Sequence, residues 1–216
     1  MVSCQARPGN PLNTPAAMAL MAQAAEAGGA GGIRANGPDD IAAIRAVTNL
    51  PIVGLHKLGN PAGVFITPTY DAAAEVVAAG ADLVALDGTL RPRPDGQQLS
   101  QQIHRIHDEL GVPVMADVDS LDAGLAAREA GADLVATTLS GYTNSRTPTD
   151  PDVDLVRQLA AELDCPVIAE GRIRTAQDVR AVCDAGAFAV VVGHAITDPM
   201  DITSRLVGAI PRRQNR

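Results

Sequence analysis

Charged and polar side chains stand at the ends of short apolar runs along the whole chain. Gln5 follows "VSC", Lys57 follows "PIVGLH", Asp117 follows "VPVMA" and Glu170 follows "CPVIA". Polar groups in such positions are costly to bury unless they are paired, so their recurrence points to one shared site. A Lys beside carboxylates can transfer protons when burial or a neighbouring cation lowers its pKa, or it can form a Schiff base.

Three further polar residues occupy equivalent places. Arg34 lies in "GGIRAN", Asp87 in "ADLVALDG", and Thr137 or Thr138 in "ADLVATTLS". Arg34 is the cation expected to lower the pKa of Lys57. A purely structural ion pair of Arg34 with Asp87 or Asp117 is the alternative interpretation.

Two glycine-containing segments, "EGRIRT" and "GHAITDP", follow the last two apolar runs. Gly171 and Gly193 would let the backbone approach an anion closely, and Arg172 and His194 come directly after them. In barrels, loops in these places commonly bind phosphate through backbone N–H groups. The two segments predict a phosphate site, with ordinary glycine turns as the alternative.

An internal repeat shows which elements must position these residues. Ala-Gly recurs at Gly28, Gly80, Gly131 and Gly186, about every 50 residues, between an Ala-rich stretch and an apolar run. A second series of apolar runs, each led by Pro, alternates with the first. Eight short strands alternating with eight helices predict a single (β/α)8 TIM barrel, with an open flavodoxin-like sheet as the alternative.

The expected helices have recognisable starts, such as Ser120 and the capping-box-like pair Thr175 and Asp178. Asp82 and Asp133 stand at strand starts, away from the candidate site, and are expected to contribute to stability. Because His56 and Lys57 are adjacent on one strand, one faces the interior, and we expect it to be Lys57. The helices are expected at 14–27, 39–48, 71–79, 97–110, 120–130, 152–163, 175–185 and 199–208.

Composition limits the partners of this chain of 216 residues. Its net charge is -8 and its aromatic fraction is 2%, which disfavours nucleic-acid binding. It shows no signal peptide or membrane-spanning run, and its three cysteines are expected to be buried free thiols, so we expect a cytoplasmic protein. No metal-ligand spacing is present, and we expect neither a metal nor another cofactor.

Residues 1–210 are expected to form one catalytic domain, and residues 211–216 a short basic tail. The Ala-rich helices would allow a homodimer.

The motifs "VSCQ", "GGIRAN", "ALDGT" with "RPRPDG", "MADV", "TTLSGYT" and "VIAEGRI" together resemble the N-acetylmannosamine-6-phosphate 2-epimerases. The resemblance runs from Val2 to about Ile210. It implies interconversion of N-acetylmannosamine 6-phosphate and N-acetylglucosamine 6-phosphate, a step in sialic-acid breakdown. It also implies that Lys57 transfers the proton, with Glu170 and Asp117 as further catalytic residues. The implied substrate contacts are Gln5 and Arg34. Asp87, Thr138 and Tyr142 are expected to bind the substrate as well.

Two positions depart from the pattern of that family. The chain reads Leu58-Gly59 where the family often has Arg-Asp, and Asp198 where the family commonly has Arg near the phosphate. A carboxylate beside a phosphate is repulsive, so Asp198 must point away or Arg172 and Arg174 must compensate. A Schiff-base aldolase, another sugar-phosphate isomerase and a non-catalytic sugar-phosphate-binding barrel are the alternatives.

Overall fold

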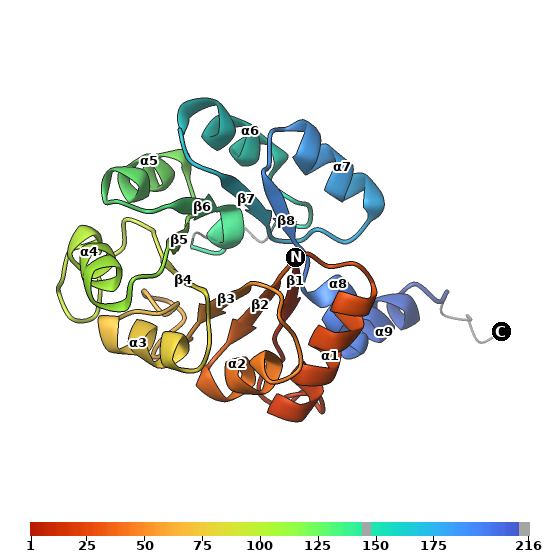
Figure 1. Ribbon diagram of the computed structural model, residues 1–216. Coiled ribbons are helices and arrows are strands. Elements are labelled where there is room, and N and C mark those ends of the chain that lie inside the picture. Colours follow the sequence, from red (N-terminus) through yellow and green to blue (C-terminus); the bar gives the residue numbers. More distant parts are fainter. Residues whose placement is uncertain (144–147, 212–216) are drawn as a thin grey trace.

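Eight short strands run parallel and pair in the order of the sequence around a barrel, in a computed structural model that describes residues 1–143 and 148–211 (Figure 1). The last strand returns to the first, where the amide of Ser3 donates to the carbonyl of Val192 at 2.9 Å. The predicted (β/α)8 barrel is therefore confirmed over the open sheet. The strands are β1 (Val2–Cys4), β2 (Ile33–Asn36), β3 (Ile52–Leu55), β4 (Leu83–Asp87), β5 (Val114–Asp117), β6 (Leu134–Ala136), β7 (Val167–Glu170) and β8 (Ala189–Val191).

Helices surround the strands close to the predicted ranges (Figure 1). Ser120 and Thr175 cap α5 and α7 through their hydroxyls, and Thr175 forms the capping box with Asp178. The helices are α1 (Pro15–Ala27), α2 (Pro38–Arg45), α3 (Tyr70–Ala78), α4 (Leu99–Leu110), α5 (Leu121–Glu129), α6 (Val153–Glu162), α7 (Ala176–Asp184), α8 (His194–Thr197) and α9 (Pro199–Gly208), with a 3-10 turn, η1 (Thr137–Leu139). The four-residue α8 was not predicted.

The strands carry apolar side chains on both faces, as parallel sheets between helices do. One face, with Ile33, Val84 and Val114, packs against the helices. The other fills the barrel interior, with Val53, Met115 and Ile168. These interior residues fill the barrel, so a side chain at the carboxyl ends of the strands is shielded from water on the side that faces the interior.

Two aspartates fix strand starts at the amino-terminal end of the barrel, the role expected of them. Asp82 accepts the amide of Ile52 at 2.8 Å, and Asp133 accepts the amide of Val114 at 2.7 Å. Both carboxylates also accept from a cationic or titratable side chain, Arg45 and His107. Two of the four copies of the sequence repeat thus share the same geometry at a strand start.

The last two helices leave the ring of the other helices. α8 packs near β1, whereas α9 extends outward toward the carboxyl-terminal end of the chain and contains no buried residue (Figure 1). Asp198 joins the two helices: its carboxylate accepts the amide of Asp201 and the side-chain amide of Asn10, both at 3.1 Å. The carboxylate therefore caps the start of α9. This agrees with the first of the two alternatives expected from the sequence, in which Asp198 points away from the phosphate.

All three cysteines are free, but only Cys4 is buried; Cys165 is half-buried and Cys183 exposed, so the expectation of buried thiols is wrong for Cys183. Burial raises the pKa of the Cys4 thiol to about 12.

Over the part of the chain that the structure describes, none of the helices combines the length and apolar character that crossing a bilayer requires. Within the predicted basic tail, residues 212–216 lie outside the described residues.

Candidate active site

Lys57 lies two residues beyond β3 and reaches toward the end of β1. Its Nζ donates to Oε1 of Gln5 at 2.7 Å, and Nε2 of Gln5 donates to the hydroxyl of Ser3 at 2.8 Å. The neighbouring His56 points to the other side, where its ring lies 2.9 Å from Glu75 on α3. Desolvation lowers the pKa of Lys57, and the positive charge of Arg34 lowers it further. A Lys with a lowered pKa can act as a base near neutral pH.

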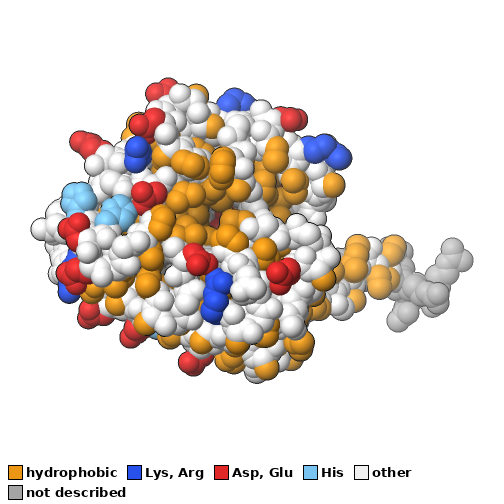
Figure 2. All heavy atoms as spheres, in the orientation of Figure 1, with side chains coloured by type: hydrophobic (Ala, Val, Ile, Leu, Met, Phe, Trp, Pro, Cys, Tyr) orange, Lys and Arg blue, Asp and Glu red, His pale blue; other side chains and the backbone are white. Residues whose placement is uncertain are grey.

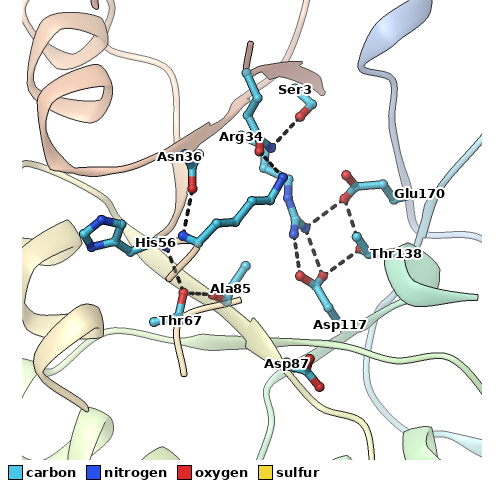
Figure 3. A network of polar contacts seen from close by, with 12 residues as sticks. Ser3, Arg34, Asn36, His56, Thr67, Ala85, Asp87, Asp117, Thr138 and Glu170 are labelled. Carbon is cyan, nitrogen blue, oxygen red and sulfur yellow. Dashed lines mark hydrogen bonds and ion pairs between the residues drawn. The ribbon is translucent and has the colours of Figure 1, made fainter. Parts of the chain in front are cut away.

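Arg34 lies within β2, and its side chain fills the centre of the barrel mouth (Figure 3). Its Nη1 is 3.0 Å from Asp117 and 2.8 Å from Glu170, and its Nη2 also pairs with Asp117. The guanidinium is 1% exposed and Asp117 0%, so this is a buried ion pair shared with a third group. Burial opposes the charge on Arg34, but the two carboxylates outweigh it and raise its pKa.

Glu170 is the most open member of this cluster, with 14% of its side chain exposed. The hydroxyl of Thr138 is 3.2 Å from Glu170 and donates to Asp117 at 2.7 Å, so it links the two carboxylates (Figure 3). Burial raises the pKa of Glu170 even though Arg34 lowers it, and the nearby Asp117 raises it further. A carboxyl group whose pKa is raised holds its proton to higher pH than an ordinary glutamate, so it can both donate and accept one.

Asp87 lies in register with Asp117 on the neighbouring strand, but its carboxylate has other partners. It accepts the hydroxyl of Thr89 and Nη2 of Arg91, both at 2.6 Å. The pKa of Asp87 is raised by burial. The structure thus places Asp87 beside the cluster, held by its own loop.

The expected phosphate residues fall into two groups. Gly171 (φ +115°) and Gly193 follow β7 and β8, with His194 as the first residue of α8. Arg172 turns away from β8, since its guanidinium donates to the carbonyls of Ser140 and Asp150, both at 2.7 Å. The structure therefore does not bring Arg172 together with Gly193 and His194.

Tyr142 also lies on the side of Arg172. Its ring is 60% exposed and stands 5.2 Å from the Arg172 guanidinium. A cavity of about 470 Å³ beside Arg172 has four aspartates in its lining, among them Asp119 and Asp150. This charge balance does not favour an anion there.

Sequence reasoning missed three buried polar residues behind the site: Thr67, Arg93 and Gln102. Thr67 contacts the backbone of His56, next to Lys57. Gln102 lies on the predicted helix 97–110, where its spacing of three residues from Leu99 and four from Ile106 could have placed it on the buried face. Nothing in the sequence pattern distinguishes Thr67.

The cluster can move protons, because a Lys of lowered pKa and a carboxyl of raised pKa share one buried cation. Among residues 1–143 and 148–211, no three His, Cys, Asp or Glu side chains are grouped so as to hold a metal ion. The chemistry that these described side chains themselves offer is general acid–base catalysis.

Comparison with known proteins adds a family to this geometry. The family profile described as "Putative N-acetylmannosamine-6-phosphate epimerase" matches residues 18–212. A relative from Cutibacterium acnes named "Putative N-acetylmannosamine-6-phosphate 2-epimerase" is 53% identical over 206 residues, which cover 94% of this chain and 90% of the relative. A relative of the same name from Clostridioides difficile is 44% identical and covers 97% of this chain and 95% of its own length.

Solved structures agree. The N-acetylmannosamine-6-phosphate 2-epimerase from Clostridium perfringens superposes with a TM-score of 0.92 at 40% identity, covering 97% of this chain and 92% of its own. The thiamine phosphate pyrophosphorylase from Pyrococcus furiosus has a TM-score of 0.62 at 20% identity, covering 94% and 89%. The second likeness concerns the fold alone.

Proposed function

The chain belongs to the N-acetylmannosamine-6-phosphate epimerase family, and we propose that it interconverts N-acetylmannosamine 6-phosphate and N-acetylglucosamine 6-phosphate. The observation that carries the proposal is Lys57, whose amine has a lowered pKa, donates to Gln5 and lies in the electrostatic field of Arg34 and Glu170 at the strand ends. The match of nearly the whole chain to epimerases favours this reaction over the aldolase and over a non-catalytic barrel. The reaction is cofactor-free proton transfer in amino-sugar breakdown, and we place it in the cytoplasm.

The reaction requires the open-chain sugar, because the C2 proton is acidic only beside a carbonyl group. Lys57 in its neutral form removes this proton and returns it to the opposite face of C2. Glu170 and Asp117 position the sugar and move protons during ring opening, with Glu170 the more accessible. The developing enolate oxygen is stabilised by Gln5 or by the Lys57 ammonium.

The buried Arg34 acts mainly through charge. It keeps Asp117 and Glu170 in place and favours the neutral form of Lys57. Its Nε is buried and has no hydrogen-bond partner among the described residues. Thr138, Asp87 and Tyr142 complete the proposed substrate contacts.

The phosphate is proposed to bind where the backbone is open at Gly171, Gly193 and His194. The occupied carboxylate of Asp198 supports this, because it is bound to Asn10 and to the start of α9. Arg172 reaches the phosphate only by releasing the carbonyls of Ser140 and Asp150.

We also propose a homodimer. α9 exposes Leu206 and Val207, and Figure 2 shows hydrophobic side chains along the segment that protrudes there. Phe188, directly before β8, is 73% exposed. Each copy therefore has two exposed apolar surfaces, one at Phe188 and one on α9, that a second copy could bury. Sedimentation should show a dimer for the wild type and a monomer for Leu206→Glu; a monomeric wild type would contradict the proposal.

The activity is tested by incubating N-acetylmannosamine 6-phosphate in deuterium oxide with the wild type, Lys57→Ala and His56→Ala. We expect epimerisation with deuterium at C2 in the wild type, and a loss of at least ~10²-fold in Lys57→Ala. His56→Ala is the matched control, since its side chain points away from the site. Epimerisation without deuterium uptake would rule out exchange through solvent, and an active Lys57→Ala would rule out the role of Lys57. The unphosphorylated sugar, measured in parallel, tests whether the phosphate matters.

A further inference from the structure

Thr67 is a buried residue with an unusual backbone. Its φ of +43° lies in the left-handed region, which β-branched residues rarely adopt, and its side chain is fully buried. Such a conformation persists only where the surrounding structure holds it in place. The contacts of Thr67 show what is being held.

Thr67 forms hydrogen bonds with both backbone groups of His56, the residue directly before Lys57. Its amide donates to the carbonyl of His56 at 2.8 Å, and its hydroxyl accepts the amide of His56 at 3.0 Å. The same hydroxyl donates to the carbonyl of Ala85 on β4 at 2.6 Å (Figure 3). One side chain therefore ties the end of β3 to β4 immediately before Lys57.

The backbone of Lys57 is fixed on its other side as well. Its amide donates to Oδ1 of Asn36 at 2.9 Å, from β2. Beyond it, the amide of Leu58 donates to the carbonyl of Phe65, and Lys57 pairs with Ile66 in a short antiparallel bridge. The loop from Lys57 to Thr67 is thus a hairpin that Thr67 closes.

The carbonyl of Thr67 is held from behind by two buried side chains. Nε2 of Gln102 on α4 donates to it at 3.0 Å, and Nη2 of Arg93 lies at 3.4 Å. Arg93 also donates to the carbonyl of Asp87 at 2.8 Å. Oε1 of Gln102 has no partner among the described residues, so the one hydrogen bond of this buried side chain is the bond to Thr67.

We propose that Thr67, held by Gln102, is a positioning residue that sets the place of the Lys57 amine for proton transfer. The inference rests on the proposed epimerase function and adds a residue to it that does not touch the substrate. The Lys side chain is long and flexible, so its backbone must be fixed if Nζ is to stay aligned with C2. A displacement of about 1 Å from alignment can lower a rate by ~10²-fold.

The test compares Thr67→Val, which keeps the shape but removes the hydroxyl, with Thr67→Ser, which keeps the hydroxyl. Thr48→Val is the matched control: Thr48 is also buried, and its hydroxyl accepts the amide of Leu50 at the opposite end of β3. We expect Thr67→Val to lower kcat by ~10²-fold with KM within about threefold of wild type. Thr67→Ser and Thr48→Val should stay within about threefold of the wild-type kcat.

The pH profile gives a second readout that simple destabilisation would not move. A Lys57 amine that is no longer held near Arg34 becomes better solvated and feels less of that positive charge, so its pKa rises. The acid limb of kcat against pH should therefore move to higher pH in Thr67→Val and stay in place in Thr48→Val.

Several outcomes would overturn the inference. The inference is wrong if the wild type epimerises the substrate and Thr67→Val has the same kcat as the wild type. It is also wrong if Thr67→Val, Thr67→Ser and Thr48→Val all lose kcat equally. If Thr67→Val does not fold, Gln102→Met replaces it: it removes one hydrogen bond and should lower kcat by about tenfold at unchanged KM. A wild-type kcat in Gln102→Met contradicts the inference, whereas an inactive wild type contradicts the proposed function instead.

Discussion

Ion pairs lie at both ends of the barrel, but those at the amino-terminal end are far more exposed to water. At the amino-terminal end, Asp82 pairs with Arg45, and the side chains are 52% and 29% exposed. At the carboxyl end, Arg34 pairs with Asp117 with almost no exposure. The exposed pairs fix strand starts at little electrostatic cost, whereas the buried cluster combines strong fields with a large desolvation penalty.

The difference explains why the carboxyl end, and not the amino-terminal end, carries the candidate proton-transfer groups. A buried charge network costs stability unless every member is paired, and its field acts on nearby titratable groups. At the carboxyl end this shift acts on Lys57 and Glu170, the two groups proposed to move protons. The four predictions below test the contrast between the two ends.

The largest effect is expected when the shared cation is removed. Arg34→Met leaves Asp117 and Glu170 buried without their cation and should cost about 3–5 kcal/mol of unfolding free energy. Arg45→Met, at the exposed end, removes one exposed ion pair and three hydrogen bonds to backbone carbonyls, and it should cost about 1–2 kcal/mol. Urea unfolding of both variants measures the difference, and equal losses would erase the contrast between the ends.

Removing the whole cluster should then restore stability. In Arg34→Met/Asp117→Asn/Glu170→Gln no unpaired buried charge remains, so we expect it to recover about 2 kcal/mol relative to Arg34→Met alone. Activity should stay absent, because the field on Lys57 and the proton-carrying carboxyl are both lost. A triple variant less stable than Arg34→Met would show that hydrogen bonds, rather than charge, hold this end.

The pH dependence of stability should report Glu170. Burial raises its folded-state pKa above the ordinary 4.5, so the unfolded chain gives up this proton at lower pH than the folded chain does. Unfolding free energy therefore falls as pH rises from about 4.5 to the raised pKa and then levels off for this group. Glu170→Gln should show a smaller fall over that window; an unchanged slope would mean that Glu170 titrates alike in both states.

The smallest effects are expected at the strand starts. Asp82→Asn keeps an oxygen that can accept the amide of Ile52, so it loses only an exposed ion pair. We expect a loss of at most about 1 kcal/mol and an unchanged kcat, with the same result for Asp133→Asn. A marked fall in kcat in either variant would show that the two ends are coupled.

The sequence predicted the barrel because its signals are local and repeated. Gly after each Ala-rich stretch and Pro before alternate apolar runs mark helix ends and strand starts directly. The four-residue α8 gave no such signal, because a segment as short as "HAIT" has no periodicity. α8 lies between β8 and α9 in the chain. A helix predicted at 199–208 therefore could not show that α9 packs without a buried residue.

For the site, the sequence identified residue types but not their partners. Alternation predicted that Lys57 faces inward, yet it could not show that Arg34 is shared by Asp117 and Glu170, since that depends on three strands in space. Arg172 stands beside a predicted phosphate loop, but its φ of +59° and two carbonyl acceptors turn it elsewhere. Long-range hydrogen bonds of this kind leave no pattern in the chain.

The junction of β8 with β1 has a consequence for how the molecule folds. Each of the other strand pairs joins neighbours in the sequence, whereas this junction and the Asn10–Asp198 contact join the two ends of the described chain. Closing so long a loop carries the greatest entropic cost, so these contacts should form after the folding transition state. Asn10→Ala should then speed unfolding and leave the folding rate unchanged, which makes this junction the place where the lifetime of the native barrel is set.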